Sequence, residues 1–397
     1  MAAGKNTHLE HLEDEIINKG TAGAEQAIQI LKAMGKFLSG DTGAAISVTT
    51  KWDGAPAVIC GIDPADGQFF VGTKSVFNKN DPKICKSEAD INKLYSGALA
   101  QKLIVSYNLL KDCGITGVLQ GDLMFTDDKK TETIQGERFI TFRPNTITYA
   151  AKVGSKLGDQ ITSSQLGIVF HTKYTGNTLP EMQSSFTISD NDYKATSSVW
   201  IQKAEFKNIG NTASLSPSEK QKYEAAIRMA EGSVQQTKGV LDFIQSGKKT
   251  LQIDTELKKF FNNYIKAGQP IPSVERAYKD FSNHLEKEYM KAINKLKTQA
   301  SQDRKVAELI EHLDSYQEME KQFKMLIATY MNLSMAKHIL VNKMKKISEL
   351  NLFVATASGD YEVTSPEGFV AVTGTTAVKL IDRLEFSRLN FTVPKTW

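Results

Sequence analysis

The character of the chain changes sharply at Ser216, and this change constrains the fold more than any other feature. Ser216-Pro217-Ser218-Glu219 has the form of a capping box with proline at the first helical position, which predicts the start of a helix. From there to about Leu350 the chain is rich in Lys, Glu, Ala, Leu and Met, and its breaks indicate four or five helices. β-type sequence returns at Leu352–Thr356. We therefore expect an all-helical domain inserted into a β-rich one.

Before Ser216 the chain consists mainly of short β-type runs separated by Gly, Asp and Asn. Helical spacing of apolar residues predicts one helix from Ala24 to Leu38 and another over Ser87–Lys111. This mixture predicts an α+β fold built mainly from antiparallel strands, with the ranges 1–42 (N-terminal helical segment), 43–212 and 351–397 (β-rich domain) and 213–350 (insert). The expected strands are Ala45–Thr50, Ala57–Ile62, Gln68–Gly72, Val118–Phe125, Phe139–Phe142, Leu166–Thr172, Val199–Phe206, Leu352–Thr356, Gly368–Val372 and Ala377–Ile381.

Composition says more about where the protein is located than about what it does. A net charge of +4 over 397 residues permits a polyanionic partner without requiring one. No apolar run reaches the length needed to span a bilayer, and the N-terminus lacks the apolar core of a signal peptide. The three cysteines stand far apart, without the spacing of a zinc or redox pair, which is typical of reduced thiols. We expect a cytoplasmic protein that does not associate with membranes.

Lys51-Trp52-Asp53-Gly54 lies where a predicted strand runs into a turn. A lysine can act as a nucleophile once burial, nearby cations or a metal ion favour its neutral form. Gly54 would let the backbone approach a ligand closely. On its own the motif is typical of an ordinary β-turn, so its interpretation depends on the rest of the chain.

Further segments follow this motif in the order that characterises the covalent nucleotidyltransferases, the superfamily of ATP-dependent DNA and RNA ligases and mRNA capping enzymes. Lys51-Trp52-Asp53-Gly54 resembles the first signature of that family, whose lysine is the nucleophile. Phe70-Val71-Gly72-Thr73-Lys74-Ser75 supplies Lys74 where the family more often has arginine. Val118-Leu119-Gln120-Gly121-Asp122 supplies Asp122 where it usually has glutamate.

The later signatures of the family also have counterparts. Ile168-Val169-Phe170-His171-Thr172 resembles the strand whose aromatic residue stacks on the purine; alternation places Phe170 and His171 on opposite faces, and we favour Phe170. After the helical block, Pro366-Glu367-Gly368 resembles the Glu-Gly signature whose carboxylate binds metal. Ala377-Val378-Lys379 resembles the closing strand whose lysine contacts the α-phosphate.

The resemblance implies an antiparallel-sheet nucleotidyltransferase domain and a reaction in three steps. Lys51 would attack ATP and hold AMP as a phosphoramidate; AMP would pass to a nucleic-acid 5′-phosphate, and a 3′-hydroxyl would displace it to seal the strand. Asp122 and Glu367 would position Mg²⁺ or Mn²⁺. The implied nucleotide contacts are Asp53, Gly54, Lys74, Phe170, Glu367 and Lys379.

Departures from the family pattern favour an RNA ligase of the phage type over other members. Pro56 stands where DNA ligases carry arginine, and Ile381 stands where a second lysine is common. The short stretch after Lys379 leaves no room for the OB domain of DNA ligases and capping enzymes. Two alternatives remain: a DNA nick ligase without an OB domain, and a ligase fold that binds nucleic acid or protein without catalysis. The insert lysines would track phosphates or form a solvated face: Lys287, Lys291, Lys295 and Lys297.

Overall fold

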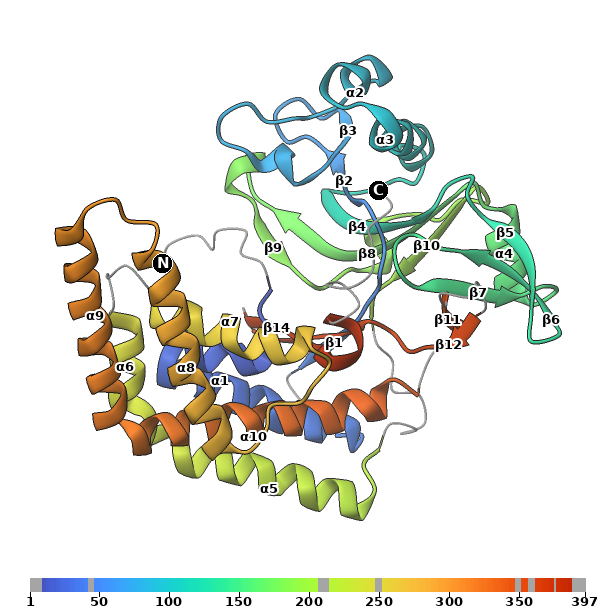
Figure 1. Ribbon diagram of the computed structural model, residues 1–397. Helices are drawn as coiled ribbons and strands as arrows, with labels where there is room; N and C mark the ends of the chain where they lie inside the picture. Colours follow the sequence, from blue (N-terminus) through green and yellow to red (C-terminus); the bar gives the residue numbers. More distant parts are fainter. Residues whose placement is uncertain are drawn as a thin grey trace.

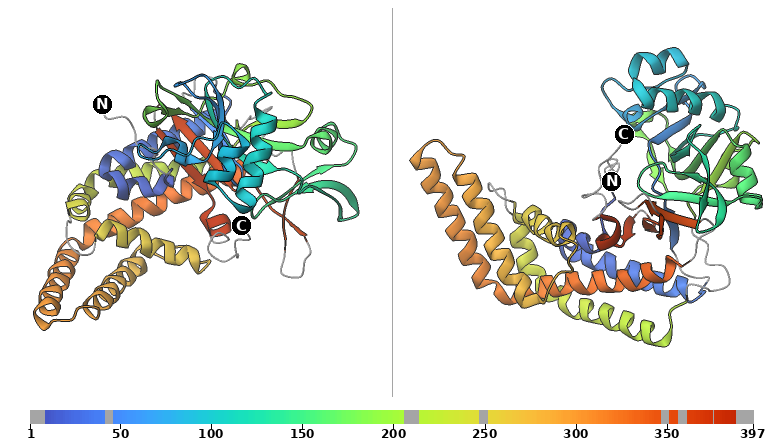
Figure 2. Two further views of the ribbon diagram at one scale, coloured as in Figure 1. Left: turned by 90° about the horizontal axis from the view of Figure 1, so that it is seen from above. Right: turned by 45° about the vertical axis from the view of Figure 1, so that its right-hand side comes forward.

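The computed structural model describes residues 9–41, 46–205, 214–246, 252–346, 351–355, 361–374 and 376–387. Two parts make up the molecule: the N-terminal helix and the helices of the inserted block gather on one side, and the larger sheets, with the remaining α-helices, lie on the other (Figures 1 and 2). Nearly all strand pairs are antiparallel; β8 and β10 run parallel. The described residues therefore form a mixed fold of helices and mainly antiparallel sheets, as expected for an α+β protein.

The helical part combines the N-terminal helix with the inserted block. One apolar core joins residues of α1 to residues of the inserted helices, so α1 packs as a member of the helical part. The inserted block contains six described α-helices, more than the four or five expected. The helices are α1 (Glu15–Leu38), α5 (Pro217–Val234), α6 (Lys238–Ser246), α7 (Ile253–Lys266), α8 (Val274–Ile293), α9 (Gln299–Glu318) and α10 (Glu320–Met344).

The capping box at the start of α5 is confirmed. The side chain of Ser216 accepts a hydrogen bond from the backbone of Glu219 at 3.3 Å, and Glu219 Oε2 accepts one from the backbone of Ser216 at 2.7 Å. Both unpaired N–H groups at this end of the helix are thus satisfied. The sequence change at Ser216 marks a real structural boundary.

The largest sheet has six strands, in the order β10-β8-β4-β2-β3, with β9 paired to β8. The expected helix over 87–111 is two helices, α2 (Glu88–Leu94) and α3 (Gly97–Leu110), because Tyr95 and Ser96 adopt extended conformations between them. Apolar side chains from both helices pack on one face of this sheet. Its strands are β2 (Ala57–Ile62), β3 (Phe69–Gly72), β4 (Val118–Phe125), β8 (Leu166–Thr175), β9 (Gln183–Ser185) and β10 (Val199–Lys203).

A five-stranded sheet, in the order β12-β11-β7-β6-β5, extends the β-rich part, and α4 (Lys156–Ser163) packs beside it. Here β11, from beyond the insert, pairs with β7, from before it. The expected strand ends Ala45, Phe206 and Thr356 lie outside the described residues. The strands are β5 (Lys130–Ile134), β6 (Glu137–Phe142), β7 (Thr148–Lys152), β11 (Asn351–Ala355) and β12 (Tyr361–Val363).

The three-stranded sheet β1-β13-β14 connects the two parts of the molecule. It consists of β1 (Ser47–Lys51), β13 (Gly368–Thr373) and β14 (Thr376–Ile381). Val48, Phe369, Val378 and neighbours on the same face lie in the core of the helical part. Side chains alternate along each strand, so Lys51 and Lys379 lie on the opposite face. That face carries the candidate site.

Candidate functional site

The structure brings Lys51 and Glu367 together although 316 positions separate them in the chain. Lys51 is the last residue of β1, and its register partner on β13 is Gly368, directly after Glu367. The ammonium of Lys51 donates a hydrogen bond to Glu367 Oε2 and forms an ion pair with it. The Lys-x-Asp-Gly segment and the Glu-Gly segment thus meet at one edge of the three-stranded sheet.

The electrostatics of this pair keep Lys51 charged in the free protein. Burial, the largest single effect, favours the neutral amine, but the surrounding carboxylates, Glu367 foremost, together raise the pKa of Lys51 above its ordinary value. The carboxylates of Asp122 and Asp53 add to this effect. A nucleophilic Lys51 would therefore need a ligand or cation that draws Glu367 away.

Asp53 is buried and bound to a neighbouring loop. Its Oδ1 accepts a hydrogen bond from Asn145 Nδ2 at 2.7 Å, and its Oδ2 accepts from the backbone N–H groups of Thr146 and Ile147 at 2.7 and 2.8 Å. Its own N–H donates to the hydroxyl of Tyr149 at 2.7 Å. These bonds fix the turn that follows Lys51, which gives Asp53 a structural role besides the predicted nucleotide contact.

Gly54 passes directly against β4 at the position of Asp122. A Cβ atom at Gly54 would lie 2.5 Å from Cβ of Asp122 and 2.9 Å from Sδ of Met124. Contacts this short do not occur, so only glycine allows the turn to lie here. The requirement for glycine in this motif thus has a steric cause, and the contact places Asp122 beside the turn that carries Lys51.

Asp122 and His171 lie on the face of the six-stranded sheet turned away from α2 and α3. His171 Nε2 is 3.6 Å from Asp122 Oδ1, and both side chains are partly exposed. The β4–β8 register shifts between Gln120, paired with Thr172, and Gly121, paired with Phe170, so His171 is the extra residue of a β-bulge. Sequence alternation placed His171 on the face opposite Phe170 but gave no sign of this bulge.

Phe170 takes a different position from the one that we expected. Its ring is fully buried in the core beneath the sheet and packs against Tyr193. A ring without exposed surface cannot stack on a nucleotide unless the core opens. This burial argues against the predicted adenine contact through Phe170, and His171, on the opposite face, is the better-placed ring.

The two remaining predicted cations, Lys74 and Lys379, occupy different kinds of position. Lys74 is exposed and begins the 3-10 helix η2 (Lys74–Phe77), so it does not lie on a strand as expected. Lys379 lies on β14 opposite Val370. Burial, with the positive charge of Lys51, lowers the pKa of Lys379 below its ordinary value. Lys379 and Lys51 thus form the cationic side of the site.

His11 lies beside Lys379, and the sequence analysis did not single it out. It forms a parallel bridge with Lys379, whose backbone N–H donates to the carbonyl of Glu10 at 2.8 Å. Among the described residues, Nδ1 of His11 is buried without a hydrogen-bond partner. No motif marks this histidine, because it joins the sheet through a residue far away in sequence.

A divalent metal ion would find two carboxylates here. Asp122 and Glu367 both act electrostatically on Lys51, but no group of three or more His, Cys, Asp or Glu side chains in the described part of the chain is placed to hold a metal. Two carboxylates suit Mg²⁺, which keeps several waters and binds substrate phosphates as well. The donor set fits a metal that arrives with a nucleotide.

These features define a mixed helical and antiparallel-sheet protein whose polar site contains a partly buried lysine–glutamate pair. The chain belongs to the family of unknown function DUF6267, whose family model matches residues 6–395. No curated protein and no solved structure matches the chain. Within the described residues, no helix is long and apolar enough to cross a membrane.

Proposed function

We propose that this protein is an ATP-dependent RNA ligase in which Lys51 forms a covalent lysyl-AMP intermediate. The observation that carries the proposal is the meeting of Lys51 with Glu367, because the resemblance requires these two signatures to share one site. Lys379, on the next strand of the same sheet face, and Asp122, against Gly54, complete the set.

In the first step, Nζ of Lys51 would form a bond to the α-phosphorus while the bond to the pyrophosphate oxygen breaks. Pyrophosphate would leave with that electron pair. Lys51 would lose one proton to water before the attack, which frees its lone pair, and a second one after it, so the phosphoramidate nitrogen keeps one N–H. Lys379 would stabilise the charge on the α-phosphate, and exposed Lys74 would meet the outer phosphates. His171 would contact the adenine in place of Phe170.

Glu367 has to release Lys51 before the lysine can attack. Mg²⁺ or Mn²⁺ bound with ATP would supply positive charge at the phosphates, where Asp122 and Glu367 are the available carboxylate ligands. Loss of the carboxylate's attraction would let burial lower the pKa of Lys51. The free protein would thus hold a charged, unreactive lysine.

The proposal of RNA, rather than DNA, rests on Pro56, Ile381 and the chain's resemblance to phage-type ligases. The lysines expected to track phosphates, Lys287 to Lys297, are exposed, and Lys291 already pairs with Glu288 at 2.6 Å. These lysines therefore give little support for RNA over DNA as the substrate. Three free, buried cysteines fit the proposed cytoplasmic setting.

One observation favours a second function, a nucleic-acid-binding module without catalysis. The Lys51–Glu367 pair is a complete, partly buried interaction, and such a pair can be purely structural. The two readings differ in whether AMP becomes covalently attached.

The test is incubation with ATP labelled in the α-phosphate, plus Mg²⁺, without nucleic acid. We expect label on the protein that is stable to base, labile to acid and absent from Lys51→Ala. Lys152→Ala is a matched control, since Lys152 also ends a strand and pairs with a carboxylate, Glu137, at 2.8 Å. Absence of label on the wild type, or equal label on Lys51→Ala, would overturn the enzyme proposal.

Two extensions of the same assay identify the nucleotide and the nucleic-acid substrate. Labelled GTP tests for capping chemistry, and we expect no label from it. Nicked duplexes of RNA, DNA and hybrid, and single-stranded RNA, separate the ligase alternatives. We expect sealing of RNA ends; sealing of nicked DNA alone would favour the DNA ligase alternative.

A further inference from the structure

We propose that His11 binds the β- and γ-phosphates of the nucleotide and the pyrophosphate released from it. This inference rests on the proposed function and assigns a ligand-contacting role to a residue that no matched signature includes. It places the leaving-group site at the edge of the three-stranded sheet beyond Lys379.

The first argument is position. His11 and Lys379 form a bridge, and residues paired in this way carry their side chains on the same face of a sheet. That face also carries Lys51, since the alternate residues of β1 and β14 lie in the helical core. Passing across the sheet, the order is Lys51 on β1, then β13, then Lys379 on β14, then His11.

This order matches the geometry of the displacement. The leaving oxygen must lie on the side of the α-phosphorus opposite the attacking nitrogen. If Lys379 contacts the α-phosphate, the pyrophosphate extends away from Lys51. Neighbouring strands lie about 4.8 Å apart, so His11 is one such spacing beyond Lys379. The leaving group would therefore reach His11.

The second argument is the unused hydrogen-bonding capacity of His11. Nδ1 lacks a partner among the described residues, which is costly unless a ligand completes it, and the His11 side chain as a whole is only partly buried, so, unlike the ring of Phe170, it retains exposed surface. The positive charges of Lys51, Lys379, Lys337 and Arg383 all act on this ring. Such surroundings suit a polyanion, whose oxygens can accept a hydrogen bond from Nδ1–H.

Burial, with these cations, lowers the pKa of His11 well below its ordinary value, so the ring is neutral in the free protein. A neutral imidazole still carries one N–H and can donate to a phosphate oxygen without adding charge. Such a contact allows release, because the product is not held by another full charge.

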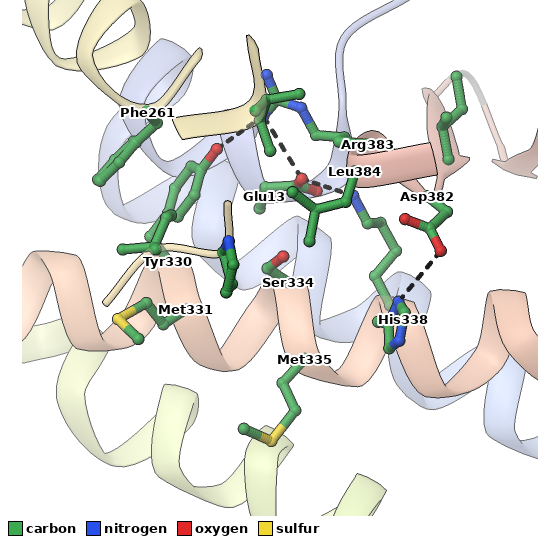
Figure 3. Close-up of a pocket in the computed structure, with 15 residues that line it drawn as sticks. Glu13, Phe261, Tyr330, Met331, Ser334, Met335, His338, Asp382, Arg383 and Leu384 are labelled. Carbon is green, nitrogen blue, oxygen red and sulfur yellow. Dashed lines mark hydrogen bonds and ion pairs between the residues drawn. The ribbon is translucent and has the colours of Figure 1, made fainter. Parts of the chain in front are cut away.

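The third argument is that His11 is held firmly in place. Leu12, Glu13 and Asp14 form the 3-10 helix η1 directly after it, and all three are buried. Glu13 pairs with Lys337 of α10 at 2.5 Å. It also pairs with Arg383 at 3.6 Å, and these two residues are labelled in Figure 3.

Tyr330 strengthens this anchor. Its hydroxyl donates to Asp14 at 2.8 Å and accepts from Arg383 at 2.8 Å, and the second contact is drawn in Figure 3. The residues after His11 are thus fixed to α10 and to the segment that follows β14. A ring so anchored can contribute to binding without first losing much freedom.

The experiment separates steps that involve pyrophosphate from steps that do not. The variants are His11→Ala, His11→Asn, whose amide retains a donor near Nδ1, and the control His338→Ala on α10, which is exposed. Inorganic pyrophosphate binding is measured by calorimetry. Two rates are then measured on lysyl-AMP protein: ATP formation from added pyrophosphate, and AMP transfer to 5′-phosphorylated RNA.

We expect His11→Ala to weaken pyrophosphate binding and slow ATP formation about 10- to 100-fold, the value of one hydrogen bond to a charged group. AMP transfer should keep the wild-type rate, and His11→Asn should recover part of the loss. Unchanged pyrophosphate binding, or an equal loss in AMP transfer, would overturn the inference. Failure of the proposed function looks different, because then the wild type itself takes up no label.

Discussion

Replacement of Asp53 by alanine tests whether this carboxylate holds the turn after Lys51. Asp53→Ala removes both acceptors at once. Asn145 can turn toward water, but the backbone N–H groups of Thr146 and Ile147 stay where Oδ2 met them at 2.7 and 2.8 Å. Each unsatisfied buried donor costs about 1–3 kcal/mol, so we expect a loss of about 2–6 kcal/mol in the free energy of unfolding.

Asp53→Asn is the matched variant. Its amide oxygen can still accept from both backbone N–H groups, and the Asn145 amide can reverse to present its oxygen. Only the added strength of a charged acceptor is lost, which we expect to cost about 1 kcal/mol. This variant keeps the turn while changing the charge.

Urea unfolding followed by tryptophan fluorescence measures both variants. Trp52 and Trp200 pack in the same core of the β-rich part and report its unfolding. Equal losses for the two variants, or a loss below about 1 kcal/mol for Asp53→Ala, would refute the reasoning from unsatisfied donors. If Asp53→Asn folds normally but takes up no AMP label, the carboxylate also contacts the nucleotide.

Three further variants test other parts of the structure. Gly54→Ala should cost about 1–3 kcal/mol in urea unfolding and reduce AMP uptake, because its Cβ would displace Asp122. Glu219→Gln should lower helix stability by about 1 kcal/mol at pH 7. A backbone hydrogen bond, with smaller effects from Lys343, lowers the pKa of Glu219 to about 2. Circular dichroism should therefore show the difference in stability between wild type and Glu219→Gln above about pH 4.5, and the difference should disappear as the pH falls toward 2. Lys337→Met should cost about 3–5 kcal/mol, because Glu13 stays buried without its closest partner, and Glu13→Gln in addition should restore part of it.

Controls make these outcomes specific. Gly232→Ala, on α5 with nothing within 4 Å of its Cβ, should stabilise the protein by about 0.5–1 kcal/mol, in contrast to Gly54→Ala. A Glu219→Gln difference that persists unchanged at pH 3 would contradict the assignment to a charged carboxylate. A Lys337→Met variant as stable as wild type would show that Arg383 alone suffices for Glu13.

Local sequence patterns predicted the elements whose signals are complete within a few residues. Strands β2 and β4 begin and end where expected, at Ala57–Ile62 and Val118–Phe125. The capping box at Ser216 forms as written in the sequence. Alternation and capping depend on near neighbours, so a local reading suffices for them.

Features that depend on distant contacts escaped prediction. His11 joins the site only because its segment pairs with β14, more than three hundred residues later. The bulge at His171 depends on the register of β8 with β4. The family pattern placed the ring of Phe170 beside the nucleotide, but the ring packs in the core beneath the six-stranded sheet. In each case tertiary pairing, which a local pattern does not encode, decides the position.

The three-stranded sheet has a mechanical consequence. One of its faces is part of the helical core, while the other carries Lys51, Lys379 and His11, with Glu367 at its edge. Asp122 and His171 belong to the six-stranded sheet. The site therefore draws its groups from both sheets, and the N–H of Thr50, which donates to the carbonyl of Ala204, with Gly54 packed on Asp122, ties the nucleophile to the six-stranded sheet as well, so a ligand bound there would brace the helical part against the β-rich part.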